Sequence, residues 1–221
     1  MIDVPRILCP VDFSDISRRA LAYAASTARW YDAALTVLHV VPELVPVDVL
    51  PPLAVQDGGL AHGVVALDRP ALQGAAEAFA AGATSGTGVT ARVLVREEPD
   101  VAQAILDEVS ESETSLVVMG THGRGGLEHL LLGSVAEQVL RHAKVPVMIV
   151  PRQARAAVPA GAIDFDSIVC GVDFSEASRR AARWGVSLAE ESDGRLALVH
   201  VLTTPPEAQL HDPGLSDPQA H

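Results

Sequence analysis

The sequence is poor in cysteine, aromatic residues and long apolar runs, and each shortage excludes a class of protein. Its two cysteines, Cys9 and Cys170, are too few for a disulfide framework or a zinc site. Both lie inside apolar runs, so we expect reduced, buried core residues. No run approaches the roughly 18 apolar residues of a membrane-spanning helix. Asp3, Arg6 and Asp12 stand where a signal peptide would need apolar residues, which predicts a cytoplasmic protein without membrane partners.

Lysine is almost absent: 15 of the 16 basic residues are arginine, and the exception is Lys144. Val145 follows it, so the GKS or GKT of a Walker-type phosphate loop is missing. With 28 acidic residues the net charge is −12, which argues against binding to nucleic acid or anionic lipid, because such binding neutralises phosphates with many cations. Any phosphate bound by this chain must be held locally.

The chain nevertheless has enough apolar residues, 48% of 221, for one full domain and a remainder. An internal repeat explains the remainder. ILCPVDFSDISRRA from Ile7 matches IVCGVDFSEASRRA from Ile168 at a constant offset of 161, and the match continues without a gap to His39-Val40 and His200-Val201. The second part of the chain therefore begins as a copy of the first.

The first copy alternates short apolar strands with amphipathic helices, which predicts a doubly wound α/β fold with a parallel sheet covered on both faces. Pro146 has no amide hydrogen, so the last strand belongs at an edge. The expected strands are 7–11, 35–41, 89–95, 116–119 and 145–150, with helices between the first two and at 70–83, 99–110 and 134–143. Residues 42–69 form a long insertion that we interpret as a flap over a ligand.

The second copy stops after a strand at 168–172, a helix and a strand at 196–202. A lone βαβ unit cannot bury both faces of its strands, so we expect it to need a partner surface or to be only partly ordered. The predicted organisation is a complete domain at 1–151, a linker at 152–165, a truncated repeat at 166–203 and a tail at 204–221.

Two loops compete for the ligand site of such a sheet, Pro10-Val11-Asp12 and the glycine-rich segment from Met119 to Ser134. Glycines let the backbone approach a ligand, and a helix N-terminus offers free amides, so the second loop is a candidate phosphate cradle, with Arg124 as its fixed charge. Simpler interpretations remain open. Ser134 and Glu137 fit a capping box, and Asp12 fits a turn or cap. His122 fits a solvent-exposed residue better than a general base, and the repeated His39 fits a structural role.

The spacing of Gly120, Gly123 and Gly133-Ser134 follows the G-2x-G-9x-G(S/T) pattern, and in this the chain resembles the ATP-binding universal stress proteins. The resemblance covers residues 5–151, including PVDFS, LHVV, VVMGTHGRGG and PVMIV, and a truncated copy at about 166–203. It implies a five-stranded parallel sheet in the order 3-2-1-4-5, an adenine nucleotide alpha hydrolase-like fold.

The resemblance also implies a site for ATP, or for ADP or AMP, with magnesium. Adenine would lie against Pro10, Val11 and Val40, and the ribose against Asp12 and Gly120, with Met119 nearby. The phosphates would be held by Gly123, Arg124, Gly125, Gly133, Ser134 and Val135. Family members often pair through their fifth strands, which predicts a homodimer through the free edge Val145–Val150.

Three functions follow as hypotheses. The favoured one is a stress-response regulator in which nucleotide occupancy changes dimer or partner contacts. The second is a slow ATPase or phosphotransferase at the same site, although the sequence offers no obvious catalytic set beyond Asp12, His122 and Arg124. The third is an interaction protein with an empty pocket. We expect no nucleotide binding by the C-terminal copy, which keeps Asp173 but has Gly171 in place of proline and lacks the glycine-rich loop.

Overall fold

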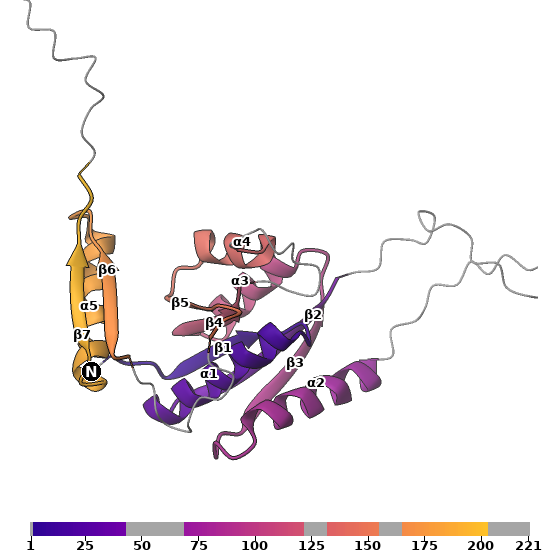
Figure 1. Ribbon diagram of the computed structural model, residues 1–221. Coiled ribbons are helices and arrows are strands. Elements are labelled where there is room, and N and C mark those ends of the chain that lie inside the picture. The colour runs from indigo at the N-terminus through magenta and orange to yellow at the C-terminus, as the bar shows by residue number, and fades with distance from the viewer. Residues whose placement is uncertain (1, 43–68, 122–131, 155–164, 203–221) are drawn as a thin grey trace, which may run out of the picture. The chain divides into compact units, whose positions relative to one another are not determined.

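The computed structural model describes residues 2–42, 69–121, 132–154 and 165–202 (Figure 1). Residues 3–163 form one compact unit, and residues 164–221 form another together with residues 1–2. The predicted flap and the centre of the glycine-rich loop lie outside the described residues, as do most of the linker and the tail. The proposed domain boundaries stay predictions.

The larger unit is a five-stranded parallel sheet in the order β3-β2-β1-β4-β5, which confirms the predicted fold class. Its elements are β1 (Arg6–Pro10), α1 (Asp15–Tyr31), β2 (Ala34–Val41), α2 (Arg69–Thr84), β3 (Ala91–Glu97), α3 (Val101–Glu111), β4 (Leu116–Gly120), α4 (Ser134–His142) and β5 (Val147–Val150).

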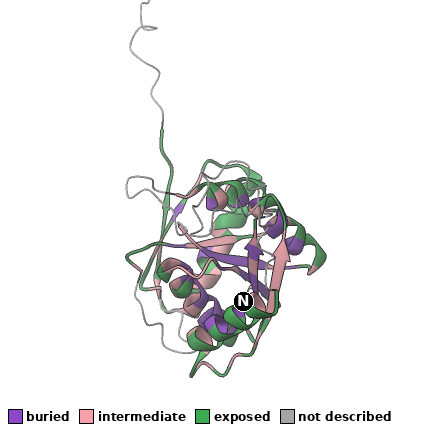
Figure 2. Cartoon of the chain, turned by 90° about the vertical axis from the view of Figure 1, so that its right-hand side faces the viewer, coloured by how far each residue is buried: buried purple, intermediate pink, exposed green. Residues whose placement is uncertain are grey.

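Helices cover both faces of this sheet, and Figure 2 marks buried residues on the strands and on the helices that cover them. α1 and α2 pack against each other over one face, and α3 and α4 pack together over the other. Successive strand residues point to opposite faces, so the central strands must be apolar on both. Leu8, Leu38 and Val117 belong to the core under α3 and α4, where they meet Ile105 and Val139.

Local sequence sets the helix ends. Ser14 caps α1 by accepting a hydrogen bond from the Ser17 amide, and the Asp100 side chain accepts from two amides at the start of α3. Asp32 ends α1 in the left-handed conformation, with φ of 52°. These polar side chains satisfy amides that have no partner within the helix.

Four predicted strand limits were wrong by two residues or more. β3 runs from Ala91 to Glu97 rather than from Val89 to Val95, and β7 ends at Val199 rather than Leu202. β5 is an edge strand as expected but begins at Val147 rather than Val145. Pro146 stands just before it, and its carbonyl accepts from the Val117 amide at 3.0 Å. Because proline has no amide to donate in return, the regular ladder begins one residue later.

The smaller unit contains β6 (Ser167–Gly171), α5 (Glu176–Glu191) and β7 (Arg195–Val199), with the two strands parallel and in register. Ser175 caps α5 through the Ser178 amide, as Ser14 caps α1. The predicted truncated copy is thus a single βαβ unit. No helix among the described residues of either unit is long and apolar enough to cross a membrane.

Candidate functional site

The carboxyl ends of β1 and β4 lie side by side at the middle of the sheet. Ile7 pairs with Leu116 and Leu8 with Val117, and the same register continued along both strands sets Val11 level with Gly120. α1 leaves β1 toward one face of the sheet, and α4 follows β4 on the other. In a doubly wound sheet such a divergence marks the crevice where ligands usually bind.

Asp12 forms a tight turn at the end of β1. Its Oδ1 accepts from the amide of Ser14 at 3.1 Å and from the Ser14 hydroxyl at 2.6 Å. The Ser14 Oγ in turn accepts from the Ser17 amide at 3.1 Å. The predicted turn role of Asp12 is therefore confirmed, and the side chain is held in one orientation beside the strand ends.

Phe13, the residue between Asp12 and Ser14, has a positive φ of 64°. Its ring lies 4.2 Å from the ring of His39 and 5.3 Å from that of Phe79, measured between centroids. His39 Nδ1 donates to the carbonyl oxygen of Val11 at 2.8 Å. These contacts offset the cost of the unusual backbone and confirm a structural role for His39.

Gly120 ends β4 where α1 passes closest to the sheet. A Cβ at this position would overlap Cγ2 of Ile16, and the carbonyl carbon of Ile16 would lie 3.5 Å away. Glycine is therefore required here for packing. It also leaves the backbone of this strand end uncovered by a side chain of its own.

The start of α4 is hydrogen-bonded to the residue that follows β4. The Gly133 amide donates to the Thr121 carbonyl oxygen at 2.7 Å, and the Thr121 amide donates to Val150 at 3.2 Å. Gly133 is the N-cap of α4, and no side chain caps this helix, in contrast to α1 and α3. The first amides of α4 thus lie at the carboxyl end of the sheet with the positive end of the helix dipole.

The capping-box interpretation of Ser134 and Glu137 was wrong. Ser134 is the first helical residue and not the cap, and it is exposed. Glu137 reaches along the helix instead, accepting from Arg141 at 2.7 and 3.0 Å. The simplest alternative explanation for Ser134 is removed.

The other predicted site residues fall into two groups. Val11, Val40 and Met119 are buried, and Pro10 and Val135 are partly buried, so their side chains serve the core as well as the crevice wall. The second group lies outside the described residues and consists of Gly123, Arg124 and Gly125, together with His122.

Two residues of the crevice were not predicted from the sequence. Ile16 occupies the space above Gly120, and the Thr121 carbonyl fixes Gly133. The isoleucine could have been found as an apolar residue in the first turn of α1, adjacent to its buried stripe. The carbonyl contact has no signal in the sequence, because any residue could supply it.

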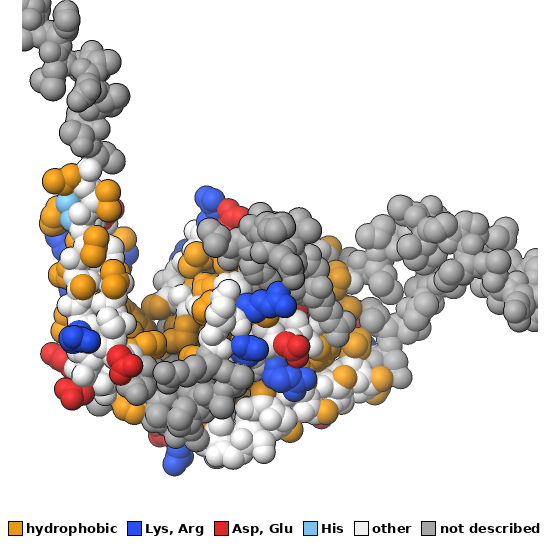
Figure 3. All heavy atoms as spheres, viewed as in Figure 1, with side chains coloured by type: hydrophobic (Ala, Val, Ile, Leu, Met, Phe, Trp, Pro, Cys, Tyr) orange, Lys and Arg blue, Asp and Glu red, His pale blue; other side chains and the backbone are white. Residues whose placement is uncertain are grey.

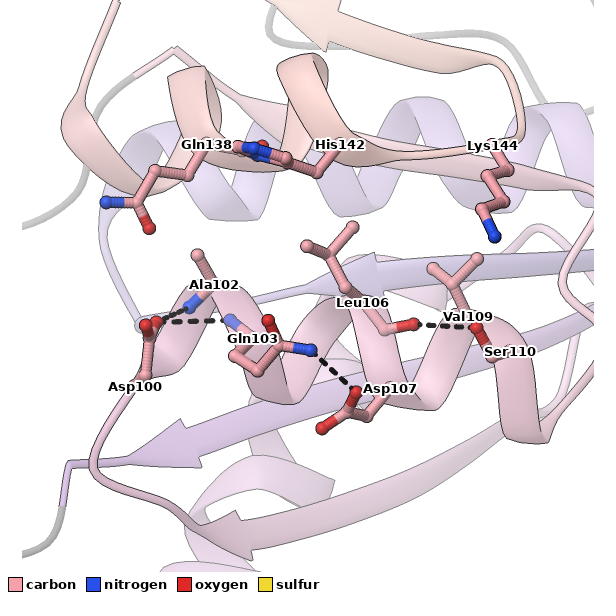
Figure 4. Close-up of a pocket in the computed structure, with 10 residues that line it drawn as sticks. All are labelled: Asp100, Ala102, Gln103, Leu106, Asp107, Val109, Ser110, Gln138, His142 and Lys144. Atoms are coloured by element: carbon pink, nitrogen blue, oxygen red, sulfur yellow. Dashed lines mark hydrogen bonds between the residues drawn. The ribbon is translucent and has the colours of Figure 1, made fainter.

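A groove of about 440 Å³ lies elsewhere, between α3 and α4 (Figure 4). Leu106 and Val109 line it together with polar side chains, several of which have partners within their own helices. Asp107 accepts from Gln103 at 2.8 Å, and His142 Nδ1 donates to the carbonyl of its own helix at Gln138, also 2.8 Å. These side chains do not converge on a common point, so the groove is a weaker candidate than the strand ends.

Neither metal binding nor thiol chemistry has a dedicated site among the described residues. No three His, Cys, Asp or Glu side chains gather there as ligands. Cys9 is fully buried in β1, and burial raises the pKa of its thiol far above the ordinary value, so it stays protonated. Cys170 is also a free, buried cysteine, and the predicted role of both as buried core residues is confirmed.

Comparison with known proteins identifies relatives over both parts of the chain. The model of the Universal stress protein family matches residues 4–151 and again residues 164–221. Universal stress protein MJ0531 of Methanocaldococcus jannaschii is 32% identical over 148 residues, which are 66% of this chain and 82% of the relative. A universal stress protein of Mycolicibacterium smegmatis is 30% identical over 198 residues, 88% of this chain. The chain spans 63% of the length of that mycobacterial protein.

Solved structures share the fold. A universal stress protein of Archaeoglobus fulgidus has a TM-score of 0.59 at 22% identity, covering 93% of this chain and 69% of its own. The hypothetical protein MJ0577 has a TM-score of 0.53 at 22% identity, covering 70% of this chain and all of its own. At such identities these likenesses concern the fold alone.

Proposed function

The chain belongs to the universal stress protein family, and from this premise we propose that it is a stress-response regulator that binds an adenine nucleotide in the crevice between β1 and β4. Nucleotide occupancy would change its contacts with a second copy or with a partner protein. The sequence offers no obvious catalytic set beyond Asp12, His122 and Arg124, which favours this regulatory role over turnover.

The observation that carries the proposal is the uncapped start of α4, held at the end of β4 by the hydrogen bond from Gly133 to Thr121. Free amides and a helix dipole favour a phosphate at this point. The spaced glycines and Arg124 of the preceding loop would complete the cradle. Ser134, exposed and outside any cap, has a hydroxyl available to donate to a phosphate oxygen.

The nucleoside would lie toward β1 and β2. Asp12, oriented by its bonds to Ser14, presents a carboxylate suited to ribose hydroxyls, next to the backbone of Gly120. Adenine would rest against the wall formed by Pro10, Val11 and Val40, with Met119 behind it. ATP, ADP and AMP are all candidates, because they share the adenosine and differ only in the number of phosphates.

Magnesium fits this arrangement as an ion carried by the phosphates. Mg²⁺ keeps several waters and commonly takes few protein ligands beside phosphate oxygens, so it needs no preformed cluster of carboxylates. The donor set at the start of α4 consists of amides and a hydroxyl, which suits phosphates directly and the metal only through its waters. The ion would neutralise phosphate charge in a chain whose net charge is −12.

The test is nucleotide binding to the full chain with Gly133→Val, measured by calorimetry with ATP and magnesium. A branched side chain at the N-cap blocks close approach of a phosphate, and we expect affinity to fall at least about tenfold, or about 1.4 kcal/mol. Gly74→Val is the matched control, since no atom lies within 4 Å of a Cβ built there. Equal affinity of the two variants, or no binding by the wild type, would overturn the proposal.

Identifying what the protein carries gives an independent check. Protein purified without added nucleotide is denatured, and the released small molecules are separated and identified. An adenine nucleotide released in near-stoichiometric amount supports the proposal and names the ligand.

The partner through which occupancy acts is proposed to be a second copy, joined along β5. This strand is an open edge of the sheet, and its side chains at Val147, Met148 and Ile149 are only partly buried. Light scattering with and without ATP should then show a dimer whose stability depends on nucleotide. A particle of one chain at tens of micromolar in both conditions would contradict this part, and leave nucleotide binding to stand on its own test.

A further inference from the structure

The sheet of the small unit is covered on one side and open on the other. α5 packs over β6 and β7 at Gly185, where an added Cβ would lie 3.0 Å from Leu196 and 3.9 Å from Cys170. Residues that alternate with these two point the opposite way. They form what we call the open face: Val169 on β6, Ala197 and Val199 on β7, and Val201 just beyond it.

The internal repeat shows which residues of the large unit correspond to the open face. At the offset of 161, three residues of the open face correspond to core residues of the large unit, Leu8, Leu38 and Val40, which are 0%, 0% and 7% exposed. Their counterparts Val169, Val199 and Val201 are 70%, 45% and 75% exposed. α3 and α4 cover the former set, and the described part of the small unit has no counterpart of either helix.

Exposed apolar side chains are concentrated in this unit. Of the nine large apolar side chains exposed among the described residues, seven belong to the small unit. Figure 3 shows apolar side chains over the side of this unit that carries β6 and β7. A soluble chain rarely leaves such a group uncovered without a binding role.

The size of the open face indicates a weak interface. Three largely exposed valines and an alanine on two strands present about 400 Å² of apolar surface, so two such faces would bury about 800 Å² in total, which is below the roughly 1,000 Å² of a stable specific interface and fits only weak, transient association. All four side chains are small, and they leave the face flat enough for a second sheet to pack at the usual spacing of about 10 Å. Buried area alone does not fix affinity, and for an interface this small we expect a weak dissociation constant of roughly 10 to 100 µM.

The charged residues at the two ends of the open face favour a second copy of the chain as its partner, in one relative strand direction. Arg195 pairs with Ser167 at the start of the two strands and alternates onto the open face, whereas Asp173 is exposed beyond their carboxyl ends. Stacking two copies with strands running the same way would bring like charges together. Antiparallel stacking about a two-fold axis brings each arginine toward the aspartate of the other copy.

We propose that the open face is a self-association surface, on which the small units of two chains stack face to face and antiparallel. It is separate from the edge of β5 and adds a second contact to it. Two different two-fold contacts on one chain would link chains beyond a dimer.

The test is sedimentation velocity on the full chain from about 1 to 300 µM, the range that spans the expected dissociation constant. Val199→Asp places a carboxylate twice in each interface, and we expect association at this surface to weaken at least about tenfold. Val186→Asp is the matched control, because Val186 has the same exposed fraction, 45%, but lies on α5. Circular dichroism of both variants checks that the fold is kept.

A second variant tests the direction of stacking. Arg195→Glu should weaken association several-fold, and added salt should reduce the difference from wild type. The proposal is overturned if Val199→Asp and Val186→Asp associate equally, or if the wild type shows no concentration-dependent step that Val199→Asp removes. A face covered by the rest of its own chain, or by a different protein, gives one of these two results.

Discussion

The packing of Gly120 against Ile16 predicts that Gly120→Ala lowers the stability of the fold and that a second substitution at Ile16 relieves this loss. In Gly120→Ala the new methyl group overlaps Cγ2 of Ile16, and the carbonyl carbon of Ile16, 3.5 Å from it, limits how far α1 can yield. Inserting one carbon into a packed contact costs about 1–3 kcal/mol. For a chain of this size each kcal/mol lowers the melting temperature by roughly 2–4 °C, so we expect a decrease of about 2–12 °C.

Two further variants make this prediction falsifiable. Gly74→Ala adds the same methyl group to an exposed turn of α2 with no atom within 4 Å, and helix propensity predicts a gain of about 0.5–1 kcal/mol. Ile16→Ala opens the space above β4, so adding Gly120→Ala to it should cost almost nothing further. The measurement is thermal unfolding of the wild type, the three single variants and the double variant, followed by circular dichroism. A loss for Gly120→Ala that persists undiminished beside Ile16→Ala would refute the packing argument.

Two other predictions concern ionised side chains. Glu108 is nearly buried, with 4% of its side chain exposed, and it pairs with Arg96 at 2.6 Å. Arg96→Ala leaves this carboxylate buried without its partner, so we expect the free energy of unfolding, measured by chemical denaturation, to fall by about 3 kcal/mol. Glu137→Ala removes a pair that is exposed and should lower it by less than about 0.5 kcal/mol. Equal losses would contradict this. The hydrogen bonds from Ser175 lower the pKa of Asp173 to about 2. Since this folded pKa lies below the unfolded value of about 3.9, the contribution is complete above pH 4 and is lost as the pH falls toward 2. Carboxyl NMR titration should show this value, and Ser175→Ala should raise it.

The order of strands and helices could be predicted from the sequence because apolar periodicity reports it directly. The stripe on α1 and the apolar runs of β1 and β4 are local signals, and a parallel sheet built from them has few possible arrangements. Strand limits such as the start of β5 were less accurate. They depend on which amides find a partner across the sheet, as at Pro146 and Val117, and that pairing is not local in the sequence.

The candidate site was predicted only in part, for a similar reason. The glycine spacing indicates where a backbone is available to a ligand, but it does not separate packing from binding. Gly120 illustrates the difficulty, since its missing side chain makes room for Ile16 whatever lies on the other side of the strand. Conversely, Ser134 and Glu137 satisfy the spacing of a capping box and do not form one, because the cap position is taken by Gly133. Spacing rules cannot detect a shift of one residue.

The duplication separates residues that serve the fold from residues available to a ligand. Both copies keep the same loop: Asp173 accepts from the Ser175 amide at 2.9 Å, as Asp12 does from Ser14. His200 donates to the carbonyl at the end of its first strand at 2.7 Å, as His39 does.

Because this loop persists in a βαβ unit without a described counterpart of β4 or α4, its geometry does not depend on a nucleotide. The turn is a structural device that holds one carboxylate at the end of the first strand. What distinguishes the first copy is the uncapped start of α4, held at the end of β4 by the hydrogen bond from Gly133 to Thr121. In the proposed function, phosphate binding therefore depends on the second half of the large unit, which has no counterpart among the described residues of the small unit.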